Sequence, residues 1–357
     1  MGLFDIFKKQ KSLVGLDIGS SCVKLIELQP VGKAGTEFKV IKAGMEVLPP
    51  EAIVDGAIMD SGAIVDAINR LFATLKIKTN DVATSVSGNA VIVKKISLPQ
   101  MSAEELGESI HWEAEQYIPF DIQDVSLDYE ILEGSGEGGN MDVLLVAVKK
   151  DKISDYTSVI TQSGKTPRIV DVDVFALQNC HEVNYGVDSG RVVALLNLGA
   201  AITNVNIIRG SNSLFNRDIA VGGNLATDAL QKELGLPYET AEALKRGEQT
   251  EGTIPDTGAG VLQNSAETIV SEIQKTFDFF RATTQEEKID QVYLAGGSAR
   301  LQGLRELLTE RLDTQVEILN PFNAVTPSKD VSADIVNQMG PAAAIAVGLA
   351  VRKVGDR

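Results

Sequence analysis

Apolar and polar positions near the start of the chain form short runs that predict strands. Three such runs lie within 13–47, and the turn Gly19-Ser20-Ser21 separates the first two. Short runs divided by glycine-containing turns are typical of an antiparallel β-meander. The segment 192–221 repeats this arrangement with hardly any repetition of sequence. We therefore expect two α/β lobes, each led by a meander, with a cleft between them.

Other segments carry the spacing of helices. Apolar residues recur three and four positions apart in 64–75, 269–280 and 301–308, which predicts an apolar stripe on each helix. The segment 340–351 is rich in small residues and has Pro341 near its start, where the missing N–H is tolerated.

A separate unit is predicted between residues 91 and 174. Its pattern indicates strand, helix, two strands, helix and strand, and its first helix opens with Ser102 and Glu105 at the spacing of a capping box. The β-α-β-β-α-β order is typical of a ferredoxin-like unit. We expect this unit to be inserted between elements of the first lobe.

The composition narrows the class of partner. The 357 residues carry 33 Lys and Arg against 49 Asp and Glu, a net charge of −16. Such a surface repels phosphate backbones and anionic lipid, so neither nucleic acid nor bare membrane is expected as a main partner, although the charge also serves solubility. Two cysteines and two histidines without metal-ligand spacing favour a reducing compartment. No apolar run is long enough to span a bilayer, and the first eleven residues lack a secretory pattern. A cytoplasmic location is expected.

The first candidate site is the turn after the first strand. Asp17 ends that strand, and Gly19, Ser20 and Ser21 offer backbone N–H and hydroxyl groups to phosphate oxygens. Lys24 begins the return strand and can neutralise phosphate charge, while Asp17 can hold a hydrated Mg²⁺ through water. Many hairpins also turn on Gly-Ser without binding anything.

A second turn repeats this logic in the other lobe. Asn197 and Gly199 stand at its start, and Thr203 supplies a hydroxyl. Two such turns facing each other across a cleft can clamp a polyphosphate, and the pair is more specific than either turn alone.

A third segment joins a buried strand to a helix. Gly296 and Gly297 allow close approach of a ligand to the backbone, and Ser298 follows them near the helix N-terminus. A turn shaped by packing alone explains the same glycines.

In this order the three segments resemble the phosphate-1, phosphate-2 and adenosine motifs of the actin/Hsp70/FtsA ATPase superfamily, and Gly222 and Gly223 resemble its hinge-side glycine pair. The resemblance implies a two-lobed actin-like (ribonuclease H-like) fold that binds ATP or ADP with Mg²⁺. It also places Glu272 and Lys275 near ribose or adenine. Arg300 follows the adenosine glycines, where it can pack on a base or be solvated.

The superfamily also implies a division of the chain. The first lobe takes 1–90, 171–190 and 335–357, and the inserted subdomain takes 91–170. The second lobe takes 191–225 and 261–334, and a small subdomain takes 226–260.

Within the superfamily, the segments 113–120, 298–304 and 340–344 resemble the PilM family of type IV pilus assembly proteins. This resemblance implies a scaffold of the inner-membrane assembly platform that binds the cytoplasmic N-terminal tail of PilN between the first lobe and the inserted unit. Tyr117, Pro119 and Phe120 are candidates for that groove, or alternatively fill the core of the unit. Pilus motor ATPases and further copies of the chain are other candidate partners, and membrane is reached only through partners.

One departure from the superfamily bears on activity. Hydrolytic relatives usually have Asp where this chain has Asn197, and an amide cannot act as a base. Nucleotide binding with at most slow ATPase activity is therefore expected. An FtsA-type division protein or filament-forming homologue is the alternative.

Overall fold

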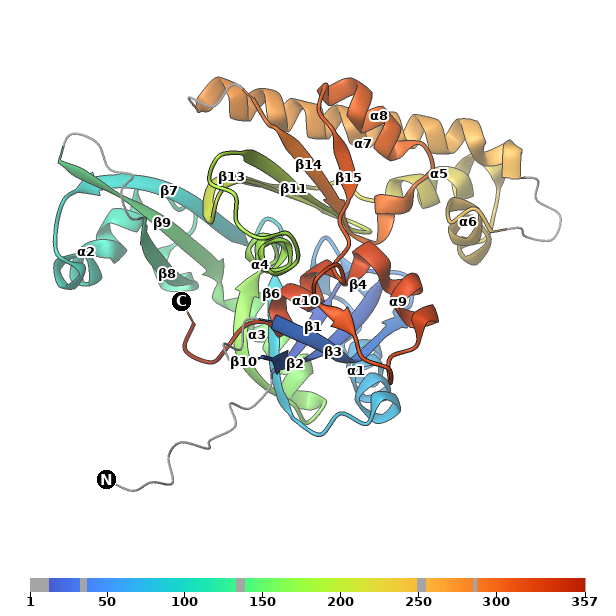
Figure 1. Cartoon of the computed structure of the whole chain (residues 1–357), viewed down its shortest axis with the longest axis horizontal. Coiled ribbons are helices and arrows are strands. Elements are labelled where there is room, and N and C mark those ends of the chain that lie inside the picture. The colour runs from blue at the N-terminus through green and yellow to red at the C-terminus, as the bar shows by residue number, and fades with distance from the viewer. Residues whose placement is uncertain (1–12, 33–36, 133–138, 249–254, 285–287, 357) are drawn as a thin grey trace.

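The computed structural model describes residues 13–32, 37–132, 139–248, 255–284 and 288–356. Two α/β lobes lie one above the other, and a smaller unit projects from one end (Figure 1). The expectation for the first eleven residues lies outside the described part of the chain. Among the described residues, no helix has the length and hydropathy to cross a bilayer.

The first lobe is built on a six-stranded mixed sheet in the order β10-β6-β1-β2-β3-β16. Its strands are β1 (Val14–Ile18), β2 (Cys22–Val31), β3 (Glu37–Val47), β6 (Asp81–Val86), β10 (Thr166–Val172) and β16 (Thr326–Pro327). The predicted meander is confirmed, because β1, β2 and β3 pair as consecutive antiparallel neighbours. Helices α1 (Ser61–Leu75) and α3 (Lys150–Gln162) pack against one face. A two-residue ribbon, β4 (Ile53–Val54) and β5 (Ala57–Ile58), precedes α1.

The second lobe has a five-stranded sheet in the order β13-β12-β11-β14-β15. Its strands are β11 (Val192–Leu198), β12 (Thr203–Arg209), β13 (Asn212–Ile219), β14 (Gln291–Ala295) and β15 (Val316–Ile318). The outer face is covered by helices α5 (Asn224–Leu234), α6 (Tyr238–Lys245), α7 (Pro255–Thr283) and α8 (Leu304–Leu312), which share one apolar core with the sheet. Helix α7 begins well before the predicted apolar stripe at 269–280.

Two helices fill the space between the lobes. Helices α4 (Asp173–Tyr185) and α10 (Ala344–Ala350) share a core with residues of both sheets (Figure 1). Their contact depends on glycine, since a Cβ on Gly348 would lie 1.7 Å from the carbonyl oxygen of Ala176. The short helices α9 (Ala333–Met339) and η4 (Gly340–Ala343) lead into α10, with Pro341 in the first turn as predicted.

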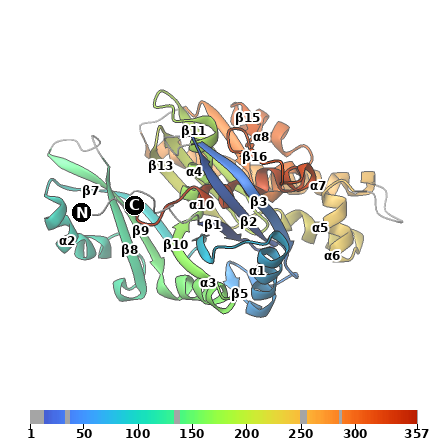
Figure 2. The same cartoon turned by 60° about the horizontal axis from the view of Figure 1, so that its bottom comes forward.

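The projecting unit departs from the ferredoxin-like prediction. It contains β7 (Val91–Pro99), α2 (Ala103–Glu115), η2 (Ile122–Asp124), β8 (Val125–Leu132) and β9 (Asn140–Lys149), and its sheet has only three strands in the order β7-β9-β8. The expected fourth strand, β10, instead pairs in parallel with β6 of the first lobe. Figure 2 shows β10 beside the first-lobe sheet, away from β7 and α2.

The apolar face of α3 explains this difference. Tyr156, Val159 and Ile160 are buried in the core of the first lobe, so α3 returns the chain to that lobe and β10 follows it there. The inserted unit is therefore narrower than the predicted 91–170 and ends near Lys149. The capping box of α2 is confirmed, because Ser102 accepts from the N–H of Glu105 while the Glu105 carboxylate accepts from the N–H of Ser102.

Candidate functional site

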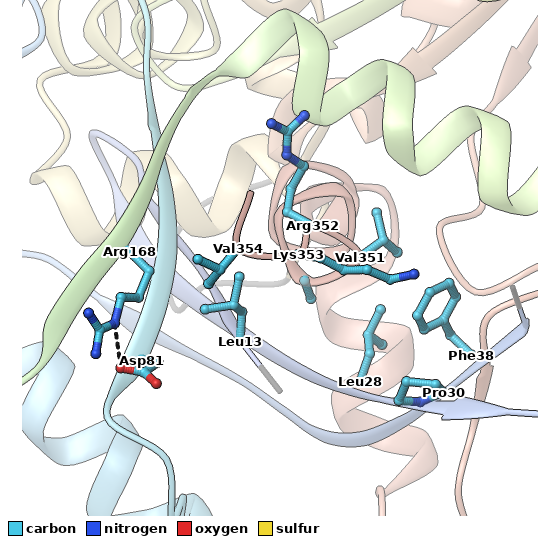
Figure 3. A pocket seen from close by; sticks show the side chains of 11 residues that line it. Leu13, Leu28, Pro30, Phe38, Asp81, Arg168, Val351, Arg352, Lys353 and Val354 are labelled. Carbon is cyan, nitrogen blue, oxygen red and sulfur yellow. Dashed lines mark hydrogen bonds and ion pairs between the residues drawn. The ribbon is translucent and has the colours of Figure 1, made fainter. Parts of the chain in front are cut away.

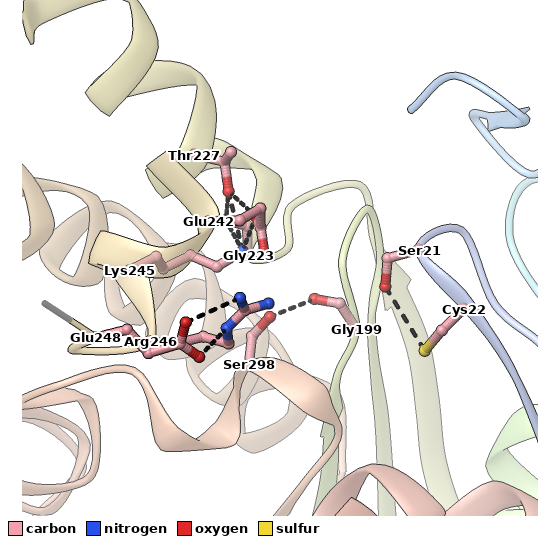
Figure 4. A network of polar contacts seen from close by, with 10 residues as sticks. All are labelled: Ser21, Cys22, Gly199, Gly223, Thr227, Glu242, Lys245, Arg246, Glu248 and Ser298. Carbon is pink, nitrogen blue, oxygen red and sulfur yellow. Dashed lines mark hydrogen bonds and ion pairs between the residues drawn. The ribbon is translucent and has the colours of Figure 1, made fainter. Parts of the chain in front are cut away.

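A cleft of about 520 Å³ lies between the two lobes. Its walls come from the β1–β2 turn, the β11–β12 turn, the segment after β14 and helix α6. Figure 4 shows these parts meeting, with Ser21 on the first-lobe turn across from Ser298 and the polar side chains of α6. The sequence predicted the meeting of the three turns, and the structure brings them together.

The β1–β2 turn is held by a buried ion pair. Lys24 Nζ lies 2.8 Å from Asp17 Oδ2, and the two residues are directly opposite each other in the hairpin. Burial by itself would lower the pKa of Lys24, but the charge of Asp17, together with smaller contributions that include the hydrogen bond to Asp17 and the charge of Asp173, outweighs burial and raises the pKa of Lys24. The N–H of Gly19 donates to the Cys22 carbonyl at 3.1 Å, closing a tight turn. Lys24 therefore stays cationic beside the turn, where its positive charge can attract an anion.

The second and third turns support each other. Ser298 Oγ donates to the Gly199 carbonyl at 3.0 Å, and Gly296 packs so closely that a Cβ would lie 2.2 Å from the Leu198 carbonyl oxygen. Gly296 also has φ +96°, which favours glycine. Gly297 differs, because a Cβ there would meet only the Ala342 side chain at 3.9 Å. The protein itself leaves the space above Gly297 open, as expected where a ligand approaches the backbone.

Gly222, Gly223 and the Thr203 hydroxyl lie behind the second turn and support it. Thr203 donates to the Val221 carbonyl at 2.6 Å and does not line the cleft. Gly222 and Gly223 pack under the turn, where a Cβ on Gly222 would lie 2.5 Å from the Ala200 carbonyl oxygen. These residues shape the second turn from behind.

Helix α6 closes the side of the cleft beside the third turn. Glu242 accepts from Thr227 and forms an ion pair with Lys245, whose ammonium group also donates to Thr227 at 2.9 Å. Arg246 and Glu248 pair at 2.8 Å at the rim. This network places a carboxylate and a cation on the wall of the cleft between the third turn and α6.

Asp173, at the first turn of α4, adds a carboxylate at the base of the cleft. Ser85 Oγ donates to it at 2.6 Å. Burial, followed by the negative charge of Asp17, raises its pKa to about 6. Sequence reasoning missed Asp173 because it lies 156 positions from Asp17, and only the packing of α4 between the lobes brings them together.

The residues present fit a hydrated Mg²⁺. Asp17 and Asp173 repel each other across the base of the cleft, and a cation between the phosphates and these carboxylates would relieve that repulsion. Among the described residues no group of three or more His, Cys, Asp or Glu side chains is arranged to hold a metal directly. Such a site suits Mg²⁺, which keeps most of its waters and takes its remaining ligands from phosphate oxygens.

A second cavity, the tail groove, measures about 540 Å³ and lies between the inserted unit, the first lobe and the β12–β13 turn of the second lobe. Its apolar wall includes Leu144 and Val146 of β9 and Phe175 of α4, and its polar floor includes Asp171, Gln178, Asn179, Ser211, Asn212, Ser213 and Arg352. A smaller apolar cavity of about 300 Å³ lies on the other side of the segment that contains Arg352. Figure 3 shows Arg352 pointing away from the apolar side chains of that smaller cavity.

Residues 15–354 match the family described as type IV pilus assembly protein PilM. The chain belongs to the PilM family. A solved structure of a PilM–PilN type IV pilus biogenesis complex is 28% identical, covers 97% of this chain and 100% of that chain, and superposes with a TM-score of 0.85. The two-lobed actin-like fold is thereby confirmed.

Other proteins resemble this PilM-family chain less closely in sequence or in fold. The cell division protein FtsA of Helicobacter pylori is 25% identical over an alignment 252 residues long, which covers 62% of this chain and 49% of FtsA. The chain spans about half the length of the curated relatives it matches first. The structure of MreB5 of Spiroplasma citri bound to ADP is 14% identical, covers 95% of this chain and 94% of that chain, and has a TM-score of 0.51; it shows likeness of fold alone.

Glu272 and Lys275, which the superfamily resemblance placed near ribose or adenine, lie outside the cleft. Glu272 and Lys275 pair with each other at 2.6 Å on an exposed face of α7 and do not line the cleft. Glu242 and Lys245 of α6 line the cleft instead and have the same Glu-x-x-Lys spacing. No site residue was expected in the small subdomain 226–260, which contains α6.

The aromatic residues assigned to the partner groove also lie elsewhere. Tyr117 and Phe120 pack against the core of the inserted unit, beneath Lys94 and Lys149 respectively, and Pro119 between them is exposed. None of the three lines the tail groove. The alternative left open by the sequence, that these side chains fill the unit's own core, holds for Tyr117 and Phe120. The other predicted residues Asp17, Gly19, Ser20, Ser21, Lys24, Asn197, Gly199, Gly296, Gly297, Ser298 and Arg300 all line the cleft.

Proposed function

We propose that this PilM-family protein is a nucleotide-occupied scaffold of the type IV pilus inner-membrane assembly platform, and that it binds the cytoplasmic N-terminal tail of PilN in the tail groove. The observation that carries the proposal is the groove itself, which lies where the PilM resemblance implies a partner. Attachment to the inner membrane then runs through PilN.

The strand β9 supports an occupant in the groove. Its side chains are apolar on both faces: Val143, Leu145 and Ala147 pack in the core with α2, whereas Leu144 and Val146 face the groove. A strand that is apolar on both faces is usually covered on both. The groove face is already partly covered, since Leu144 is buried and Val146 packs against the first-lobe core, and an extended tail with alternating apolar residues would complete that cover.

The edges and floor of the groove suit a peptide backbone. Strands β8 and β10 are the edge strands of their sheets among the described elements, and both border the groove. Three buried side-chain atoms in the floor, Asp171 Oδ2, Asn179 Nδ2 and Arg352 Nε, have no hydrogen-bond partner, and the Arg352–Asp171 ion pair is long at 3.6 Å. Buried polar atoms normally have partners, and peptide N–H and C=O groups offer both kinds.

The cleft supports ATP or ADP as the resident ligand. Lys24 and the two turns would meet the phosphates, the open space above Gly297 would receive the nucleoside, and Glu242 with Lys245 would border it. Mg²⁺, when bound, would neutralise phosphate charge beside Asp17. Because Asn197 carries no charge and cannot accept a proton, turnover is at most slow. Besides Asp17, which pairs with Lys24, Asp173 is the carboxylate at the base of the cleft.

Binding of a synthetic PilN tail peptide, measured by calorimetry with and without ATP, tests the proposal. Val146→Glu places a charge on the apolar wall of the groove and should abolish tail binding while leaving nucleotide binding intact. Asp17→Ala should weaken nucleotide binding. Trp112→Ala, on the exposed outer face of α2, is the matched control within the inserted unit. If the wild-type protein binds no tail peptide in any nucleotide state, the scaffold role is wrong. Nucleotide-dependent sedimentation of polymers would instead favour the filament-forming alternative.

A further inference from the structure

A row of polar side chains crosses the second-lobe sheet from the cleft toward the first lobe. Asn197 of β11 is the cross-strand partner of Asn204 of β12, which is in turn the partner of Asp218 of β13. Residues directly opposite each other on neighbouring strands lie on the same face of the sheet. Asn197 and Asn204 line the cleft, whereas Asp218 lies behind them and does not.

The far end of this row is fixed by a contact between the lobes. Asp218 Oδ2 accepts a hydrogen bond from the backbone N–H of Gly88 in the first lobe at 2.6 Å. Its Oδ1 accepts from Asn204 Nδ2 at 2.8 Å. A carboxylate only accepts hydrogen bonds, so Asn204 must turn its NH₂ group toward Asp218.

The orientation of Asn204 then sets that of Asn197. With its nitrogen committed to Asp218, Asn204 presents Oδ1 to its other neighbour, and Asn197 Nδ2 donates to that oxygen at 2.8 Å. Asn197 Oδ1 is the atom left over, and Asn197 borders the cleft. The direction of each amide therefore follows from the single carboxylate at the end of the row.

We infer that Asp218 and Asn204 are positioning residues that hold the carboxamide oxygen of Asn197 toward the cleft, where it accepts from the water shell of the cation that accompanies the nucleotide. An amide oxygen is neutral, yet it is a hard oxygen of the kind that Mg²⁺ and its waters accept. Replacement of the usual Asp by Asn thus removes the charge at this position and keeps the oxygen. The inference rests on the proposed occupancy of the cleft by nucleotide.

An isosteric substitution can reverse the row. In Asp218→Asn, the single oxygen of the new side chain is needed by the Gly88 N–H, so its NH₂ faces Asn204. Asn204 must then turn its oxygen toward position 218 and its nitrogen toward Asn197, whose NH₂ is forced toward the cleft. No hydrogen bond in the row is lost, but a donor replaces the acceptor that faces the cation.

The experiment is a Mg²⁺ titration of nucleotide binding, followed with a fluorescent ATP analogue at fixed concentration. We expect Asp218→Asn to weaken the apparent Mg²⁺ affinity on the order of tenfold, as loss of an outer-shell partner commonly does, with binding in EDTA nearly unchanged. Adding Asn197→Asp to Asp218→Asn should restore Mg²⁺ affinity, because a carboxylate at 197 accepts from Asn204 and still presents an oxygen. Asn216→Ala, two positions away on β13 and outside the row, is the matched control and should behave as wild type.

Two outcomes overturn the inference. Equal Mg²⁺ affinity in wild type and Asp218→Asn shows that the row does not orient Asn197, and failure of Asn197→Asp to rescue shows that the effect arises elsewhere. Either result leaves the proposed function standing, since the wild type still binds nucleotide and tail peptide. Absence of nucleotide binding in the wild type, by contrast, removes both.

Discussion

Asp173 offers a direct test of how the cleft is organised, because ionisation of its carboxyl group lowers the stability of the folded protein. Its pKa is raised from the usual 3.8 to about 6, first by burial and then by the negative charge of Asp17. One pKa unit corresponds to about 1.4 kcal/mol, so the ionised form costs the folded protein roughly 3 kcal/mol. Because the carboxyl group lies at an open cleft, where solvent screens charge, we expect a measured cost of about 1–3 kcal/mol.

The sign of the pH dependence follows from proton linkage. Between about pH 4 and pH 6 the folded protein keeps a proton on Asp173 that the unfolded chain releases. The unfolded state therefore binds fewer protons, and the contribution of this group to stability falls as the pH rises through that window. Above pH 6 the full cost is present.

The substitution Asp173→Asn removes this charge and keeps an oxygen for the Ser85 hydroxyl. Urea unfolding of wild type and variant should show equal stability near pH 4 and a gain for Asp173→Asn that reaches about 1–3 kcal/mol at pH 7.5. Asp66→Asn, at an exposed position of α1, controls for the general effect of one fewer negative charge. A variant that is destabilised equally at every pH would refute the reasoning, because Asp173 would then be a structural partner and not a strained site residue.

Three further substitutions test other parts of the site and fold. Lys24→Met leaves Asp17 buried without its partner and should lower the free energy of unfolding by about 3–5 kcal/mol in urea melts, whereas a double variant with Asp17→Asn should recover much of that loss; equal losses would mean the pair is not coupled. Gly297→Leu fills the open space beside the third turn and should weaken binding of a fluorescent nucleotide at least about tenfold, with an unchanged melting temperature. Gly348→Val drives a side chain into the Ala176 backbone and should lower the melting temperature by several degrees, and a variant as stable as wild type would show that α4 and α10 can move apart.

Local patterns predicted the parts of the site that are local in the chain. The turns at Gly19 and Gly199 could be read from sequence because a strand, a glycine-containing turn and a return strand lie within about ten residues of one another. The capping box at Ser102 and Glu105 was equally local. In each case short-range hydrogen bonds determine the structure, so the residue types and spacing suffice.

Long-range packing decided what the sequence could not predict. Strand β10 joined the first lobe because the apolar face of α3 is buried there, and nothing within 150–172 distinguishes that choice from pairing with β7. Asp173 entered the cleft for the same kind of reason. Glu272 and Lys275 were assigned by the region of the chain that the superfamily resemblance indicates, and only the tertiary position of α6 places Glu242 and Lys245 on the cleft instead.

Helix α4 presents Asp173 to the cleft and Gln178 and Asn179 to the tail groove. The two sites therefore share one helix. Phe175, which also lines the tail groove, lies about 3 Å along the helix from Asp173, and Gln178 about 7.5 Å, at a rise of about 1.5 Å per residue. Any coupling free energy between nucleotide and tail must be reciprocal: a nucleotide that tightens the tail by some factor is itself tightened by the same factor. A shift of α4 would therefore change both proposed sites. An insertion or deletion within α4 should impair binding of nucleotide and of tail together.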